Sequence, residues 1–103
     1  MSKYDPDQAT ITKNKEEVTE PPKYKVILHN DDFTPMDFVT LVLEKVFRYS
    51  YRQAESLMLK VHYSGSGIVG IYPYEIAELK LVKATSMAQE EGYPLMLTLE
   101  QES

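Results

Sequence analysis

The sequence predicts an α+β fold, in which a three-stranded antiparallel sheet packs against helices in the order β-α-α-β-α-β. Three short runs rich in apolar and β-forming residues predict strands at 24–28, 68–72 and 95–99. Between these runs, apolar residues recur at helical spacing, and capping residues, Gly or Pro bound each segment. At 103 residues, the chain has room for one small domain with a modest core.

The first helix is predicted over 35–48. Thr34 is placed to cap it, Pro35 occupies the first helical position, and Asp37 follows three residues after the cap. A second capping pattern, Ser50 with Gln53, starts a shorter helix after a very short loop, so the two helices are expected to pack as a hairpin. Their apolar stripes are Met36, Val39, Leu43, Val46 and Phe47 in the first and Ala54, Leu57, Met58 and Val61 in the second.

A third helix is predicted from Pro73 to about Glu91. Gly92 suits the position that follows a helix, and Pro94 prevents the helix from continuing. One side of this helix carries Ala77, Leu81, Ala84 and Ala88, with Ile76 and Met87 adjoining.

The chain divides into a flexible extension, residues 1–22, and one domain, residues 23–103. The extension is polar, poor in apolar side chains and closed by two prolines, so it buries too little surface to offset its conformational entropy. The alternative is a partly docked arm that uses Ile11 and Val18.

Composition narrows the classes of function. A net charge of −5 without a basic run disfavours nucleic-acid binding, and the absence of cysteine excludes disulfides, thiolate metal sites and Cys nucleophiles. No apolar run reaches the roughly 20 residues of a membrane span, and the polar start resembles no signal peptide. We expect a monomer in a bacterial cytoplasm, with a plastid stroma as the lesser alternative.

Two motifs invite interpretations that their context does not favour. "GSGIVG" at 65–70 matches a dinucleotide-binding pattern, but a helix precedes it and a strand follows, the reverse of what phosphate binding needs. His62 with Asp31 and Asp32 offers ligands for a metal-dependent hydrolase, which remains an alternative. His29 is expected to point away from them, because alternate strand residues face opposite sides.

The polar stretch "HNDDFTPMDF" at 29–38 instead suggests a binding site. If the helix pair brings its apolar residues together, a pocket forms between them, with Asn30, Asp31 and His62 at its mouth. Carboxylate, amide and imidazole acceptors above an apolar hole suit a free peptide N-terminus with a large hydrophobic first side chain. The pocket walls would be Met36, Val39, Met58 and Val61.

The blocks "YKVILHNDDFTPMDFV", "LMLKVHYSGSGIVG", "YEIAELK" and "YPLMLTLE" resemble the ClpS family of adaptor proteins, from about Pro21 to Glu100. The resemblance implies a non-enzymatic adaptor without cofactors. It would bind N-degrons that begin with Leu, Phe, Tyr or Trp and deliver them to a Clp AAA+ unfoldase of the A or C type.

Carried over by position, the family's residues fall into three sets in this sequence. The amine-binding set is Asn30, Asp31 and His62; the side-chain pocket is Asp32, Thr34, Met36, Val39, Met58, Val61 and Leu95; the unfoldase-binding set is Glu75, Glu78 and Lys80. The chain departs from relatives at Pro73 and at Tyr93. Tyr93 neighbours Leu95, and the sequence leaves open whether it alters the pocket rim. A third hypothesis is a generic interaction domain that uses the "YEIAELK" face.

Overall fold

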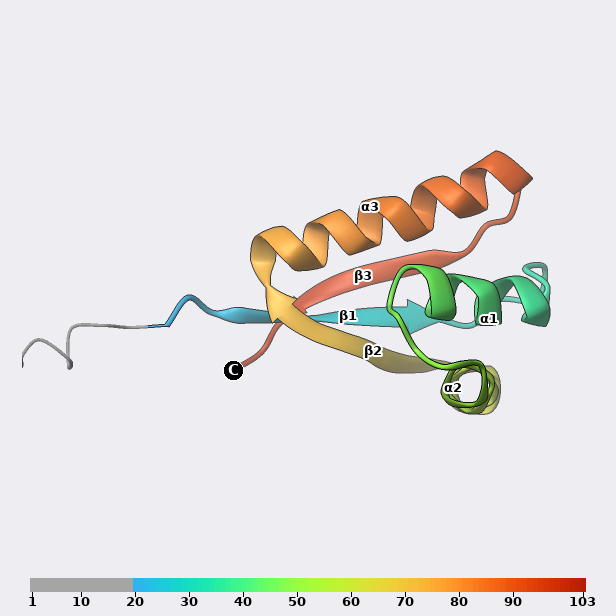
Figure 1. Ribbon diagram of the computed structural model, residues 1–103, viewed down its shortest axis with the longest axis horizontal. Helices are drawn as coiled ribbons and strands as arrows, with labels where there is room; N and C mark the ends of the chain where they lie inside the picture. Colours follow the sequence, from blue (N-terminus) through green and yellow to red (C-terminus); the bar gives the residue numbers. More distant parts are fainter. Residues whose placement is uncertain (1–19) are drawn as a thin grey trace, which may run out of the picture.

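The computed structural model describes residues 20–103, whose arrangement is shown in Figure 1. The strands are β1 (Lys23–His29), β2 (Ser66–Pro73) and β3 (Met96–Gln101), and they form one antiparallel sheet in the order β2-β1-β3. The three predicted strands and the α+β class are therefore confirmed. The predicted extension over 1–22 lies outside the described residues, except for its last three, which are exposed and belong to no helix or strand.

The helices are α1 (Met36–Lys45), α2 (Tyr51–Ser64) and α3 (Tyr74–Glu91). α3 lies along the sheet and contacts all three strands, whereas α2 contacts β2 and α1 packs on α2. Val26 and Leu28 of the central strand are fully buried beneath the helices, while Ile27 between them is only partly buried on the opposite face. This alternation is the period-two pattern of a sheet with one covered face.

The two paired helices differ from their prediction in length. The first was predicted over 35–48, and the second was predicted to be the shorter of the two. α1 ends at Lys45, and α2 with 14 residues is longer than α1 with 10. The chain leaves the helix early because Arg48 adopts a left-handed conformation (φ 66°) and the Tyr49 N–H donates to the Leu43 carbonyl at 3.2 Å. Figure 1 shows α1 from the side and α2 nearly end-on, so the predicted pair makes contact but crosses steeply.

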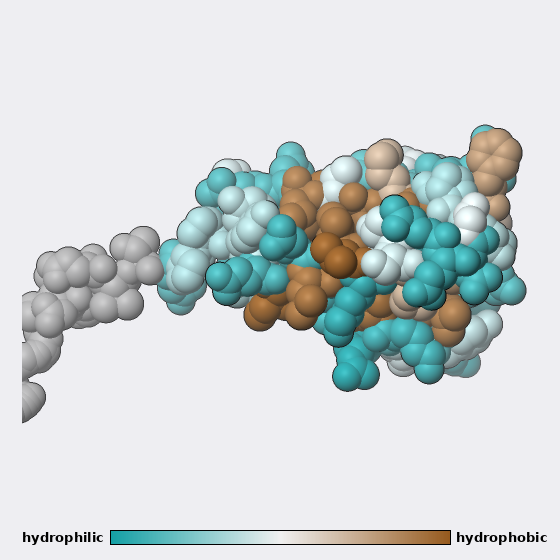
Figure 2. Space-filling view, turned by 90° about the horizontal axis from the view of Figure 1, so that it is seen from above, coloured by the Kyte–Doolittle hydropathy of each residue, from teal (hydrophilic) through white to brown (hydrophobic). Residues whose placement is uncertain are grey.

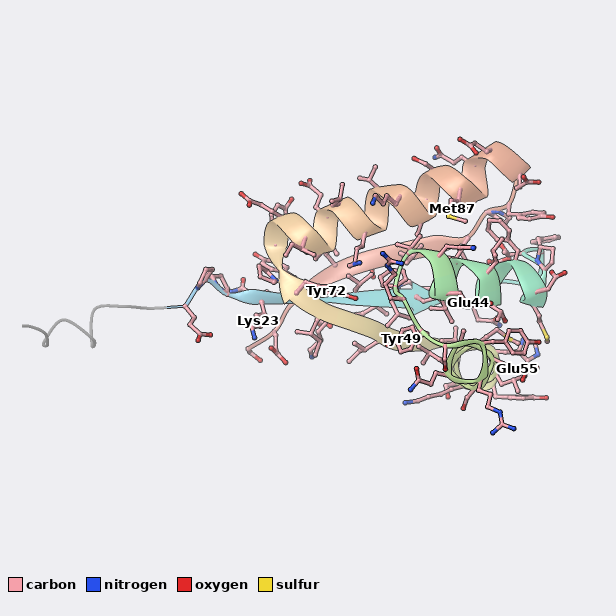
Figure 3. The ribbon with its side chains drawn as sticks, viewed as in Figure 1. Lys23, Glu44, Tyr49, Glu55, Tyr72 and Met87 are labelled. Carbon is pink, nitrogen blue, oxygen red and sulfur yellow. The ribbon has the colours of Figure 1, made fainter. Side chains whose placement is uncertain are left out.

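The start of α2 is as predicted. The Ser50 hydroxyl accepts from the Gln53 N–H at 3.2 Å, and the Gln53 side chain accepts from the Ser50 N–H at 3.3 Å. Just before this capping box, the Tyr49 hydroxyl donates to the Val69 carbonyl at 2.7 Å, which ties the loop between α1 and α2 to β2 (Figure 3). This bond anchors the N-terminal end of α2 beside the sheet.

The predicted cap of α1 is wrong. Pro35 is the residue before the first helical residue, and no side chain caps the helix. The Thr34 hydroxyl donates to the Asp31 carboxylate at 2.8 Å, and it accepts no hydrogen bond from the start of the helix. A hydroxyl can donate and accept at the same time, so this bond acts through geometry, by holding the Thr34 side chain toward Asp31.

α3 packs through small side chains. Its buried residues Ala77, Ala84 and Ala88 confirm the predicted stripe, and Gly92 with φ 79° ends the helix as predicted. Ile76, expected beside the stripe, is instead 45% exposed. Figure 2 views the molecule from the α3 side and shows apolar surface along this helix. The exposed apolar residues on α3 include Ile76, Leu79 and Val82.

Lys80 connects α3 to the end of α1. Its ammonium donates to the Val46 carbonyl at 2.9 Å and lies 6.0 Å from the ring centroid of Phe47. It also lies 5.3 Å from the ring centroid of Tyr72, which extends from β2 (Figure 3). A cation is favourable beside the carbonyl end of a helix and over aromatic rings. Lys80 therefore stabilises the packing of the two helices.

We expect Lys80→Met to lower the free energy of unfolding by about 1–3 kcal/mol, because the buried Val46 carbonyl loses its donor. The measurement is urea denaturation followed by circular dichroism. Lys83→Met is the matched control, since Lys83 is an exposed lysine of the same helix. Equal midpoints for the two variants would contradict a stabilising role for Lys80.

Candidate functional site

A pocket of about 200 Å³ lies where β1 ends, between the loop that follows β1, the start of α1 and the second half of α2. Its lining consists of Leu28, His29, Asn30, Asp31, Asp32, Thr34, Met36, Val39, Met58, Val61, His62 and Leu95. The structure thus brings together every residue predicted for amine binding and for the side-chain pocket. Their roles in binding remain predictions.

The pocket is apolar at its base and polar at its mouth. Leu28 is fully buried, and Met58, Val61 and Leu95 are each no more than 8% exposed. Met36, by contrast, is 44% exposed at the start of α1, so it borders the opening. A side chain that enters this hollow would exchange water for apolar contacts.

Local backbone bonding joins the two sides of the pocket mouth. The Asn30 N–H donates to the Gly65 carbonyl at 2.9 Å, and Gly65 follows α2 in the left-handed conformation (φ 96°). Glycine adopts this conformation without the steric cost that other residues incur. His62 lies in the last turn of α2, so this bond holds the loop containing Asn30 near the imidazole.

Asp31 organises the loop itself. One carboxylate oxygen, Oδ1, accepts from the N–H groups of Phe33 and Thr34 at 2.8 and 2.7 Å. The other oxygen, Oδ2, accepts from the Thr34 hydroxyl at 2.8 Å. Desolvation by burial raises the pKa of Asp31, but the three hydrogen bonds outweigh it, so this pKa lies below its usual value of 3.8. The carboxylate is therefore charged at neutral pH and is held in the loop.

The two histidines have different surroundings. His62 is half-buried, and its ring meets that of Tyr63 edge-to-face with centroids 4.9 Å apart. His29 also lines the pocket, yet its Nε2 is bonded to Thr98 Oγ1 at 2.8 Å. One of its ring nitrogens is therefore bonded to β3, but His29 lines the same pocket as Asp31, Asp32 and His62, so the expectation that it points away from them is not confirmed.

Two lining residues, Leu28 and His29, are absent from the predicted pocket. Both end β1, directly before the polar loop, and that adjacency is the signal in the sequence that could have found them. Tyr93, whose effect on the rim the sequence left open, packs edge-to-face against Phe38 with centroids 4.9 Å apart. Both residues are partly buried, and neither lines the pocket.

The residues considered for other sites are placed as follows. Residues 20–103 hold no group of three His, Asp or Glu side chains arranged to bind a metal, His62, Asp31 and Asp32 included. In "GSGIVG", Gly65 follows α2 and the remaining five residues belong to β2. The glycines are therefore not followed directly by a helix, as a dinucleotide-binding turn requires. None of the helices described is long and apolar enough to cross a bilayer.

The predicted unfoldase-binding set lies on α3, which contributes no residue to the pocket. Glu75 and Glu78 are exposed, and Glu78 accepts from the Tyr74 hydroxyl at 3.1 Å. Lys80 differs from them, because its ammonium is turned inward onto the Val46 carbonyl. The two carboxylates are thus available to a partner, and the lysine is engaged within the fold.

The fold and the pocket define a small α+β binding domain with a recessed site, apolar below and rich in acceptors at its mouth. The family described as "ATP-dependent Clp protease adaptor protein ClpS" matches residues 19–98. The chain belongs to the ClpS family, and it is an adaptor of the Clp protease.

Individual relatives agree with this membership. The chain is 45% identical over 96 residues to the ATP-dependent Clp protease adapter protein ClpS of Vibrio atlanticus, covering 93% of this chain and 91% of that one. Identity to the protein of the same name from Myxococcus xanthus is 43% over 102 residues, covering 97% and 95%. A solved structure of Agrobacterium tumefaciens ClpS2 bound to L-phenylalaninamide superimposes with a TM-score of 0.78 at 46% identity, covering 81% of this chain and 100% of that chain.

Proposed function

We propose that this protein binds N-degrons, chains that begin with a free Leu, Phe, Tyr or Trp, and delivers them to a Clp AAA+ unfoldase. The observation that carries the proposal is the convergence of Asn30, Asp31 and His62 on the mouth of one apolar pocket. L-Phenylalaninamide, bound to the Agrobacterium relative, has the same chemistry, a free α-amine beside a benzyl side chain. The adaptor would act by binding alone, without catalysis or cofactor.

Two energetic terms would share the recognition. Burying a Leu or Phe side chain contributes roughly 1.5–3 kcal/mol. Each charge-assisted hydrogen bond to the ammonium contributes about 1.5–3 kcal/mol before the costs of association. An internal phenylalanine offers only the first term and leaves the polar mouth unpaired, so the pocket would select chain ends.

The second partner is the N-terminal domain of an A- or C-type Clp unfoldase. We assign its contact to Glu75 and Glu78, whose carboxylates are exposed on α3. Lys80, assigned by resemblance to the same set, would contribute mainly by holding α3 against α1. Because α3 lies outside the pocket, substrate and unfoldase could be bound together. In this proposal residues 23–103 are a monomeric adaptor domain of the bacterial cytoplasm, and 1–22 are the extension that engages the unfoldase.

The test is calorimetric titration of peptides that differ only in their first residue, each with a free N-terminus. We expect Leu, Phe, Tyr and Trp peptides to bind and peptides starting with Ala, Ser or Asp to bind far more weakly. A chain with Phe at position three and Ser first serves as the internal control. Binding that ignores the first residue would refute the proposed function.

Met36→Ala is expected to widen the selectivity. Met36 borders the opening, so its long side chain crowds a first residue that branches at Cβ. Removing it should strengthen binding of Val- and Ile-initiated peptides by about tenfold, while Phe loses some contact area. Leu41→Ala is the control, because Leu41 is exposed on α1 and does not line the pocket. Unchanged discrimination against Val and Ile would show that Met36 is not the residue that excludes them.

A further inference from the structure

The acceptor groups of Asp31 are nearly all used before any ligand arrives. A carboxylate has about four lone-pair positions, two on each oxygen. Oδ1 accepts two backbone N–H groups, those of Phe33 and Thr34, and is full. Oδ2 accepts only the Thr34 hydroxyl and so has one position left. Whatever cation meets Asp31 at the pocket mouth must meet it at Oδ2.

The direction of that remaining position depends on Thr34. The backbone bonds hold Oδ1 in place but leave the carboxylate free to rock about it, because nothing else in the described contacts holds Oδ2. The Thr34 hydroxyl donates to Oδ2 at 2.8 Å and so restrains it. Thr34 also lines the pocket beside Asp31. One residue thus joins the pocket wall to the amine acceptor.

We infer that Thr34 is a positioning residue for amine recognition, whose hydroxyl directs the free lone pair of Asp31 Oδ2 toward the substrate ammonium. This inference rests on the proposed function and assigns Thr34 a role beyond filling the pocket wall. Hydrogen bonds to a charged group depend on alignment, so a misdirected acceptor gives up much of its contribution.

Four side chains at position 34 separate the hydroxyl from the methyl group. Thr34→Val removes the hydroxyl and keeps the shape, Thr34→Ser keeps the hydroxyl and removes the methyl, and Thr34→Ala removes both. The hydroxyl is therefore tested twice, by Thr against Val and by Ser against Ala. Either comparison is sufficient if one variant of the other pair fails to fold.

For each variant, the affinity of a Phe-initiated peptide is measured with a free and with an acetylated N-terminus. We expect the ratio of the two affinities to fall by about tenfold on losing the hydroxyl, because the charge-assisted bond is misaligned. Thr34→Ser should keep the wild-type ratio to within about twofold. The side-chain preference, measured as Phe against Leu, should respond to the methyl group and not to the hydroxyl.

A second readout follows the Asp31 carboxyl carbon by NMR through an acid titration. The hydroxyl is one of the groups that lower the pKa of Asp31, so this pKa should rise in the Val and Ala variants and not in Ser. A ratio unchanged in both hydroxyl comparisons would overturn the inference while leaving the proposed function intact. A wild-type protein that binds both peptides equally would instead refute the proposed function itself.

Discussion

A peptide that begins with phenylalanine should bind at least about 100-fold more weakly once its α-amine is acetylated, since each charge-assisted bond contributes about 1.5–3 kcal/mol and more than one is lost. Acetylation removes the positive charge and two of the three N–H donors. It leaves the side chain unchanged, so the apolar base of the pocket can still be filled. The polar mouth, with Asn30, Asp31 and His62, would then desolvate without a matching cation.

The affinity difference is measured by fluorescence anisotropy with the two forms of one labelled peptide. A free-amine peptide that begins with alanine is the complementary control, because it keeps the cation and loses the apolar side chain. If acetylation of the amine and replacement of the first Phe by Ala each weaken binding, the amine and the apolar side chain are both required. Equal affinity of the free and acetylated Phe peptides would show that the acceptors at the mouth do not contact the chain end.

The second large effect is expected from Asp31→Asn, which should lower both affinity and stability. The asparagine oxygen can still accept the backbone N–H groups of Phe33 and Thr34, but its NH₂ group faces the Thr34 hydroxyl and the incoming ammonium. We expect affinity for a free N-terminus to fall by about 30- to 100-fold and the free energy of unfolding by about 1–3 kcal/mol. Asp37→Asn, the same change at an exposed position outside the pocket, should cost no more than about 1 kcal/mol.

The stability effect should depend on pH in a defined direction. The pKa of Asp31 is lower in the folded protein than its usual value of 3.8, so folding favours the ionised carboxylate. The contribution is therefore complete above about pH 4 and is lost as the pH falls through the lower, folded-state value. Urea denaturation of the wild type and Asp31→Asn between pH 2.5 and 6 should show two curves that converge toward acid. Parallel curves would contradict the hydrogen-bonded carboxylate.

Local sequence was sufficient to predict the secondary structure wherever a signal acts within a few residues. The capping box of Ser50 and Gln53 forms as expected, because both bonds lie within one turn. Gly92 ends α3 because its left-handed conformation is a property of glycine itself. The apolar stripes of the helices were correct in most positions, since burial follows helical periodicity, but Met36 of the first stripe is 44% exposed.

The predictions failed where a polar group could form its hydrogen bond with more than one partner. Thr34 has the right spacing to cap α1. Only the folded loop shows that its hydroxyl instead donates a hydrogen bond to the Asp31 carboxylate. The early end of α1 was also missed, because Val46 and Phe47 keep their apolar side chains buried although the helix has already ended at Lys45. Periodicity records burial of a side chain and not the hydrogen bonds of its backbone.

The sequence by itself determined the order of elements, most of the buried helix positions and the set of residues that we propose recognise a cationic, apolar ligand. Tertiary structure alone decided that these residues share one hollow, because they come from segments that meet only when the Asn30 N–H reaches the Gly65 carbonyl. It also decided that Lys80 holds two helices together and that Asp31 has one acceptor position left. Each of these contacts depends on how the whole chain packs, and the spacing of residues along the sequence does not reveal that packing.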